Sequence, residues 1–197
     1  MSYSKKVLIT EEFHPIIEEG FTHLGYEVDN IWDIDTAGVK AIIHNYEILV
    51  INSKIKVDKT LLENANKLKV VARVGSGLEI IDQEECQKRK IHIISTPEGN
   101  ANAVAEHTLA FILSAFNNLF KSQNEILQHE WIREGNRGVE LSGKTLGIIG
   151  CGNNGSQLVN LLAGFDTEIL IYDIVDISSK ITNPRARQVS NMQEIYD

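Results

Sequence analysis

Short runs of apolar and β-branched residues alternate with amphipathic segments through the first half of the chain. The runs predict strands at residues 7–10, 27–30, 48–51, 70–73 and 92–94. The segments between them predict helices at residues 15–24, 37–44, 59–65 and 83–89. Strands and helices that alternate at this spacing form a parallel sheet covered on both faces. Residues 1–99 are therefore predicted to form a flavodoxin-like α/β domain.

The alternation stops at Pro97, Gly99 and Asn100, where a longer helical pattern begins. Residues 101–120 are apolar around most of a helix circumference, which predicts burial on several sides, either between two domains or in a dimer. A more polar helix is predicted at residues 122–129. We place the domain boundary near Asn100, so that residues 100–197 hold linker helices and a second domain.

A strand, a glycine turn, a helix and a second strand are predicted between Thr145 and Asp173. The apolar run at residues 146–149 leads into Gly150, Gly152 and Gly155, which have the spacing G-x-G-x-x-G. In this motif the first glycine permits a tight turn, the second lets a pyrophosphate approach the backbone, and the third lets helix and strand pack closely. The flanking strands favour a nucleotide-binding Rossmann unit over an ordinary turn.

The helix that starts near Asn153 is expected to direct its free amides at the phosphates of a dinucleotide. Asp173 ends the second strand, where a carboxylate can accept the hydroxyls of the adenosine ribose. A 2′-phosphate would be repelled by Asp173, and Ile174 and Val175 follow it instead of an arginine. The predicted cofactor is therefore NAD and not NADP.

A complete dinucleotide-binding domain contains two βαβαβ halves. Only the 24 residues from 174 to 197 follow Asp173, and residues 191–196 have the pattern of another helix start. We therefore expect the chain to stop inside its second domain, which leaves an incomplete Rossmann domain.

The composition narrows the possible partners. The chain has 197 residues, 43% apolar and 23% charged, and a formal charge of −8, which disfavours nucleic acid and anionic membranes. Small molecules or proteins remain as partners.

Cys86 and Cys151 lie far apart without a C-x-x-C motif, so neither a disulfide framework nor a zinc site is predicted. No signal peptide or membrane span is recognisable, and the expected location is the cytoplasm.

Three motifs occur in order: ARVGSGLEIID, TPEGNANAVAEHTL and GKTLGIIGCGNNG. Together with the long helix between them, they resemble the NAD-dependent D-2-hydroxyacid dehydrogenases, and most closely the D-3-phosphoglycerate dehydrogenase branch. The resemblance covers essentially the whole chain. It implies an oxidoreductase that transfers a hydride between NAD and a small, anionic D-2-hydroxy acid.

The resemblance also implies roles for individual residues. Arg73, Ser76 and Gly77 would bind the substrate, the last two through backbone amides. The cofactor-binding residues it implies are Ser76, Val104, Gly150, Gly152, Asn153, Asn154, Gly155 and Asp173. Alternatives remain open, because the glycines can simply close a turn, Arg73 can pair with a surface acid, and Val104 can belong to the helix core.

Two positions depart from the D-3-phosphoglycerate dehydrogenase pattern. Asn52 stands where that branch often has an arginine, and Glu79 and Ile80 replace an aspartate and an asparagine. The loss of a cation weakens the case for a phosphorylated substrate, although Lys54 can partly substitute for it.

No catalytic residue is assigned. The family uses a histidine, a glutamate and an arginine that lie beyond the point where this sequence ends. Glu106 and His107 are adjacent on a helix, so their side chains point about 100° apart and cannot form a relay. Structural or surface roles are favoured for the other histidines, which are His14, His23, His44, His92 and His129.

Two functions are weighed. The first is a D-2-hydroxyacid dehydrogenase seen as a truncated chain that is inactive alone. The second is a non-catalytic nucleotide-binding or interaction module that keeps the fold. A signalling receiver is excluded, because Asn52 stands where a phosphorylatable aspartate would be needed. An unpaired sheet edge and the apolar helix at residues 101–120 predict a homo-oligomer, such as a homodimer.

Overall fold

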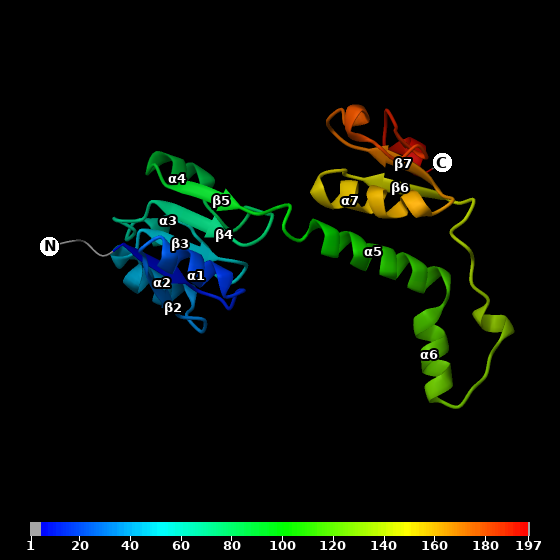
Figure 1. Ribbon diagram of the computed structural model, residues 1–197, viewed down its shortest axis with the longest axis horizontal. Helices are drawn as coiled ribbons and strands as arrows, with labels where there is room; N and C mark the ends of the chain where they lie inside the picture. The colour runs from blue at the N-terminus through cyan, green and yellow to red at the C-terminus, as the bar shows by residue number, and fades with distance from the viewer. Residues whose placement is uncertain (1–4, 197) are drawn as a thin grey trace. The chain divides into compact units, whose positions relative to one another are not determined.

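The computed structural model describes residues 5–196, and the chain divides into two compact units, Met1–Pro97 and Glu98–Asp197 (Figure 1). Each unit contains its own parallel sheet and its own hydrophobic core. The α/β class predicted from the sequence is confirmed.

The first unit is built on five parallel strands in the order β2-β1-β3-β4-β5. This is the flavodoxin-like strand order, as predicted. The strands are β1 (Lys6–Ile9), β2 (Glu27–Asn30), β3 (Ile48–Ile51), β4 (Val70–Arg73) and β5 (His92–Ser95). The connecting helices are α1 (Ile16–His23), α2 (Thr36–Ile42), α3 (Lys59–Leu62) and α4 (Gln83–Lys88), with a 3-10 turn at Ile43–Asn45.

The central strand β3 is buried along its whole length and divides the core of the first unit into two layers. Leu49 and Ile51 belong to one hydrophobic cluster, whereas Ile48 and Val50 belong to the other. This division follows from the strand geometry, because successive side chains point to opposite faces of a sheet. Both faces are therefore covered, as a parallel sheet requires.

The second unit contains a three-stranded parallel sheet in the order β6-β7-β8. The strands are β6 (Thr145–Ile149), β7 (Glu168–Tyr172) and β8 (Ala186–Gln188). The helices are α5 (Ala101–Phe116), α6 (Leu119–Leu127), α7 (Asn153–Leu161) and α8 (Gln193–Tyr196), with 3-10 turns at Glu134–Asn136, Leu162–Gly164 and Ser178–Lys180. Helix α5 packs along α7, and their apolar faces join the core formed with β6 and β7 (Figure 1).

The prediction of one helix over residues 101–120 is wrong. Helix α5 ends at Phe116, and α6 begins at Leu119, three residues before the expected start of the second helix. Asn118 separates the two helices because its backbone is left-handed, with φ 53°. A right-handed helix cannot continue through that conformation, which asparagine adopts more readily than most residues.

Helix α5 buries only one face. Ala101 and Ala105 are buried, whereas the Phe111 side of the helix is open, with Phe111 54% exposed. Large apolar side chains also remain exposed on α6 and beyond it, at Leu119, Phe120, Ile126, Leu127 and Trp131. The sequence predicts that α5 is buried on several sides, which would require another surface to pack against its exposed side.

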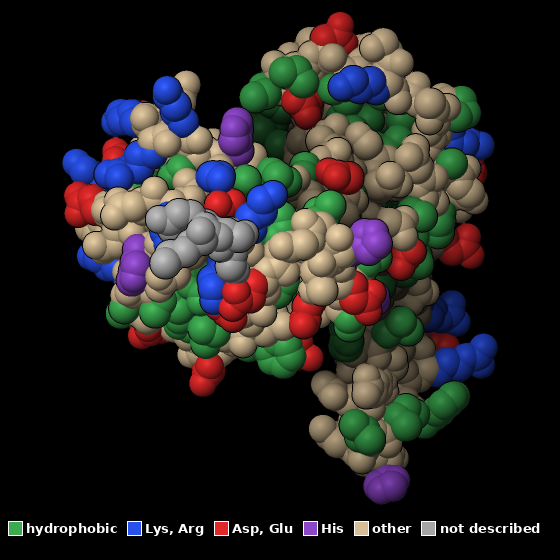
Figure 2. Space-filling view, turned by 60° about the vertical axis from the view of Figure 1, so that its left-hand side comes forward, with side chains coloured by type: hydrophobic (Ala, Val, Ile, Leu, Met, Phe, Trp, Pro, Cys, Tyr) green, Lys and Arg blue, Asp and Glu red, His purple; other side chains and the backbone are tan. Residues whose placement is uncertain are grey.

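Charged side chains of both signs are mixed on one face of the molecule. On the face shown in Figure 2, lysine and arginine side chains are interspersed with acids and do not gather into one basic patch. None of the helices formed by residues 5–196 is long and apolar enough to cross a membrane. Within the same residues, no group of three histidine, cysteine or acidic side chains is placed to hold a metal ion.

Candidate functional site

The glycine turn connects the carboxyl end of β6 to α7 and lies beside the carboxyl end of β7. Gly150 has a backbone φ of 87°, in the left-handed region that favours glycine. Its amide donates to the Tyr172 carbonyl at 2.8 Å, which extends the pairing of the two strands by one residue. The tight turn predicted at Gly150 is therefore present.

The other two glycines differ in their surroundings. A Cβ atom on Gly155 would collide with the carbonyl oxygen of Gly150, so this position needs glycine for α7 to approach the end of β6. A Cβ atom on Gly152 would meet no atom within 4 Å. The close packing predicted for Gly155 is confirmed, and the backbone at Gly152 is open to a ligand.

Asp173 is held directly against the glycine turn. Its Oδ2 atom accepts a hydrogen bond of 2.7 Å from the Cys151 amide, and its Oδ1 atom accepts one of 3.1 Å from the Val175 amide. These amides stabilise the charged carboxylate and hold the pKa of Asp173 below its ordinary value, with the Cys151 amide the larger cause. The carboxylate therefore stays ionised at neutral pH.

The first turn of α7 has unused donors. Gly152 caps the helix without a side-chain hydrogen bond, and Asn153 and Asn154 are exposed. Within residues 5–196, the amides of Asn153 and Asn154 donate to no protein acceptor. Free amides at the positive end of a helix are suited to an anion such as a phosphate.

Ser156 also stabilises the turn, a role that the sequence did not reveal. Its hydroxyl donates to the Cys151 carbonyl at 3.0 Å, while the Cys151 amide donates to Asp173. Both polar groups of the Cys151 backbone are thus satisfied. A serine one position after the last glycine of the motif is the signal that could have suggested this bond.

Val104 lies in the second turn of α5 and is half-buried. It is not among the apolar side chains that pack against the core of the second unit, which include Leu109, Ile112, Leu113 and Phe116 of the same helix. This placement gives the helix-core alternative little support.

In the first unit, Arg73 ends β4 and its side chain folds under the loop that follows. Its Nε atom donates to the Asn52 carbonyl at 3.0 Å, and its Nη1 atom donates to the Gly77 carbonyl and pairs with Glu79 Oε1 at 3.0 Å. The Arg73 side chain is 10% exposed, and that of Glu79 is 67% exposed. Arg73 therefore pairs with an acid at the surface, which is one of the alternatives left open by the sequence.

The amides of Ser76 and Gly77 are available for a ligand. They donate to no protein acceptor among residues 5–196, and Ser76 is exposed. The Gly77 carbonyl accepts from Arg73, so the acceptor of this residue is used while its N–H remains free. Consecutive free amides in a loop can bind a carboxylate.

Glu11 is a site residue that the sequence did not identify. Its Oε1 atom accepts the amides of Asn52 at 2.8 Å and of Lys54 at 3.3 Å, while the Lys54 ammonium donates to the Trp32 carbonyl at 2.8 Å. Glu11 follows β1 and Asn52 follows β3, the two strands between which the sheet order reverses. Ligands of open α/β sheets bind at this switch point.

No histidine of residues 5–196 hydrogen-bonds to a carboxylate. The imidazole of His14 accepts the Ile16 amide, and the ring of His107 packs edge-on against Phe111. Glu106 accepts a hydrogen bond from Asn102, not from its neighbour His107.

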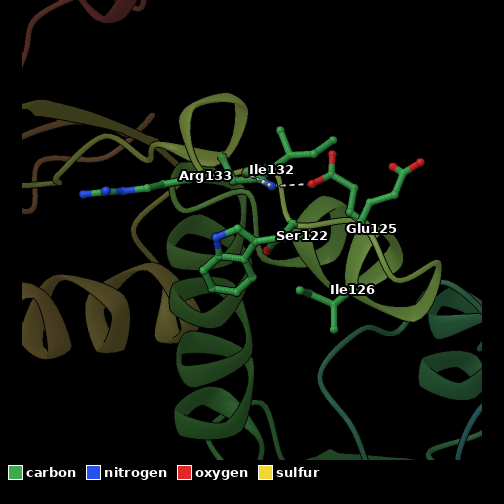
Figure 3. Close-up of a pocket in the computed structure, with 8 residues that line it drawn as sticks. Ser122, Glu125, Ile126, Ile132 and Arg133 are labelled. Carbon is green, nitrogen blue, oxygen red and sulfur yellow. Dashed lines mark hydrogen bonds between the residues drawn. The ribbon is translucent and has the colours of Figure 1, made fainter.

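An apolar cavity of about 220 Å³ lies between α6 and the segment after it. Ser122, Glu125 and Ile126 come from α6, and Ile132 and Arg133 come from the following segment, with Arg133 pointing away from Glu125 (Figure 3). Asn136, which also lines the cavity, donates from its side-chain amide to the Glu125 carboxylate. None of the predicted site residues lines it.

The family comparison matches residues 7–192 to the D-isomer specific 2-hydroxyacid dehydrogenase catalytic domain. A D-3-phosphoglycerate dehydrogenase of Methanocaldococcus jannaschii is 33% identical over 168 residues, which are 85% of this chain and 32% of that protein. A hydroxypyruvate reductase of Thermotoga maritima is 33% identical over 132 residues, which are 67% of this chain and 43% of that protein. The chain therefore spans about a third to two fifths of these relatives.

The fold is also found among solved structures. A D-lactate dehydrogenase of Aquifex aeolicus, solved in complex with NAD and lactic acid, superposes on this chain with a TM-score of 0.82 at 21% sequence identity. The matched region covers 94% of this chain and 56% of the D-lactate dehydrogenase chain. At that identity the likeness concerns the fold. The match over residues 7–192 shows that this chain belongs to the D-isomer specific 2-hydroxyacid dehydrogenase family.

Proposed function

We propose that the second unit binds NAD at the glycine turn between β6 and α7. The observation that carries this proposal is the bond from the Cys151 amide to Asp173, because it fixes a carboxylate beside a helix start whose amides are free. The pyrophosphate would lie on the amides of Asn153 and Asn154, next to the open backbone at Gly152.

The residues present fit the adenosine half of this cofactor. Both oxygens of Asp173 already accept one backbone amide, and each has a further lone pair for a ribose hydroxyl. Its negative charge would repel the 2′-phosphate of NADP. Val104 is kept as a residue that would contact the cofactor, since it lies half-exposed outside the core.

We further propose that the loop after β4 binds the substrate carboxylate. The Ser76 and Gly77 amides would donate to it, and Arg73 lies beneath the loop and holds the Gly77 carbonyl. Ser76 would also approach the cofactor. The reaction is the transfer of a hydride between NAD and a D-2-hydroxy acid, in which the bound cofactor supplies the hydride carrier.

The assay for this reaction follows NADH formation when the protein is mixed with NAD and a set of D-2-hydroxy acids. We expect no turnover by the 197-residue chain alone, because no catalytic residue is assigned in it, and turnover by a longer form that also carries the family's histidine, glutamate and arginine. That turnover falls when Ser76 and Gly77 are replaced together by proline and alanine, because one amide is lost and the other is displaced. NAD binding without turnover of any 2-hydroxy acid by the longer form would instead support the second candidate, a non-catalytic nucleotide-binding module.

A homo-oligomer formed through residues 101–120 is part of the proposal. The exposed side chains of Phe111 and Phe120 support it, because single chains rarely leave large contiguous apolar surfaces uncovered. The cytoplasm is the proposed location. Cys86 and Cys151 are both free thiols, which suits a reducing compartment.

A further inference from the structure

The loops that follow β1, β3 and β4 meet at one edge of the first sheet, because these strands are parallel neighbours. The loop after β1 carries Glu11, the loop after β3 carries Asn52, and the loop after β4 carries the proposed substrate amides. A residue on the first of these loops can therefore act on the third loop through the second.

Both polar groups of the Asn52 backbone are held by charged side chains. The Asn52 amide donates to Glu11 Oε1 at 2.8 Å, and the Asn52 carbonyl accepts from Arg73 Nε at 3.0 Å. The same oxygen of Glu11 accepts the Lys54 amide at 3.3 Å, so one carboxylate orders the start of this loop. Hydrogen bonds to a charged group are stronger than those between neutral groups.

Arg73 links the loop after β3 to the proposed substrate loop. Its Nε atom donates to the Asn52 carbonyl, while its Nη1 atom donates to the Gly77 carbonyl. Because the guanidinium is planar and rigid, the position of one acceptor restricts the position of the other. The two loops also touch directly, since a Cβ atom on Gly75 would lie 3.3 Å from Asn52 Oδ1.

We propose that Glu11 is a positioning residue for the substrate loop. It fixes the backbone of Asn52, which in turn fixes the guanidinium of Arg73. The guanidinium then holds the loop in the conformation in which the Ser76 and Gly77 amides bind the substrate carboxylate. Glu11 acts through these bonds and not by touching the substrate. This inference rests on the proposed substrate loop.

The test is a titration of the protein with D-lactate, a D-2-hydroxy acid with one carboxylate, followed by NMR at the Ser76 and Gly77 amides. Both amides shift in the native protein. In Glu11→Ala the acceptor is lost and the affinity for D-lactate falls by about fivefold, the order of magnitude that one hydrogen bond contributes. Glu11→Gln keeps an oxygen for the Asn52 amide and restores most of the affinity.

Two controls separate positioning from a general loss of stability. Glu12→Ala removes the neighbouring, exposed acid, which accepts no hydrogen bond from residues 5–196, and it leaves the affinity for D-lactate unchanged. The amide signals of residues 145–173 stay at their native positions in Glu11→Ala, because these residues belong to the second unit.

A second measurement uses the unmodified protein, so it decides even where Glu11→Ala does not fold. Coupling between two sites is reciprocal, so D-lactate bound at the substrate loop must also stabilise the bond from the Asn52 amide to Glu11. Hydrogen exchange at the Asn52 amide therefore slows on saturation with D-lactate. It slows more than exchange at the Val39 amide, which donates to the Asp35 carbonyl at the start of α2.

Three results overturn the inference. Equal affinity of the native protein and Glu11→Ala for D-lactate, or an equal loss in Glu11→Gln, contradicts the role of the Glu11 acceptor while the substrate loop stands. Exchange at the Asn52 amide that D-lactate leaves unchanged contradicts the coupling in the same way. If D-lactate shifts neither the Ser76 nor the Gly77 amide of the native protein, the proposed substrate loop itself fails, and this inference fails with it.

Discussion

The three glycines after β6 have three different surroundings, and each has a different consequence for substitution. Gly150 has a positive φ, Gly152 is open, and Gly155 lies against the Gly150 carbonyl. A side chain at Gly150 strains the backbone, one at Gly152 would obstruct only a ligand, and one at Gly155 separates α7 from β6. The sequence motif therefore combines a binding requirement with two folding requirements.

Gly155→Ala is expected to destabilise the second unit by about 1–3 kcal/mol, the usual cost of forcing extra volume into a packed site. Urea unfolding followed by circular dichroism measures the change. The control is Gly164→Ala, at a position where a Cβ atom meets nothing within 4 Å. Equal stability of the two variants would contradict the packing role of Gly155.

Asp173 predicts a pH dependence. Its pKa in the folded protein is lowered by the Cys151 and Val175 amides, so its contribution to stability is complete above the pKa of an unfolded aspartate, about 3.9. The contribution is lost as the pH falls from there through the lower folded pKa. Thermal unfolding measured across this range detects the loss.

The variant Asp173→Asn removes this titration, so its melting temperature falls less steeply below a pH of about 4. Asp33→Asn, which removes an exposed aspartate of the first unit, serves as the control. If the melting temperatures of the native protein and of Asp173→Asn fall equally steeply below this pH, the bonds from the Cys151 and Val175 amides to Asp173 do not stabilise the fold.

At the scale of elements, apolar runs predicted the strands well. The bounds of β2, β3 and β4 agree with the prediction. Strand β8 was missed, since Ala186, Arg187 and Gln188 form no apolar run and join the sheet through backbone pairing with β7. Pairing partners that are distant in sequence leave no periodic signal.

In the candidate site, residues could be predicted from their spacing in the sequence, but contacts between distant segments could not. Gly150, Gly155 and Asp173 were identified from their spacing, but the bond from Cys151 to Asp173 depends on two strand ends that lie side by side only in the fold. Glu11 and Asn52 are brought together in the same way by β1 and β3. The pair of Arg73 and Glu79 depends on the backbone path of a loop, which residue types alone do not specify.

The break between α5 and α6 predicts different effects for two substitutions at Asn118. Asn118→Ala places an alanine in a left-handed conformation that alanine adopts less readily than asparagine or glycine, which costs about 1 kcal/mol, while the alanine and glycine variants both lose the bond from the Asn118 side chain to the Arg137 carbonyl. Asn118→Gly avoids that cost. Chemical unfolding distinguishes them, and an alanine variant as stable as the glycine variant would show that α5 and α6 can join.

At the scale of the whole molecule, two parallel-sheet units share one chain. The first provides a loop with free amides, and the second provides the glycine turn and Asp173. The sheet of the second unit has β6 at one edge, and α5 and α6 expose large apolar side chains. These features lead to the prediction that copies of the chain associate.

Light scattering at micromolar concentration is expected to give a mass of at least twice the chain's 22.0 kDa. Replacing Phe111 and Phe120 together by aspartate is expected to yield monomers, because two charges enter the proposed interface. The control is Ile16→Asp, which changes an apolar residue that is 64% exposed on α1. A monomeric native protein would contradict the proposed interface.

The most direct test of the account is a calorimetric titration of the protein with NAD and with NADP. It predicts saturable binding of NAD, weaker binding of NADP, and a loss of NAD affinity in Asp173→Ala, which removes both the ribose acceptor and the partner of Cys151. Absence of NAD binding, or equal binding of NAD and NADP, would contradict the assignment of the glycine turn and Asp173 as an NAD site.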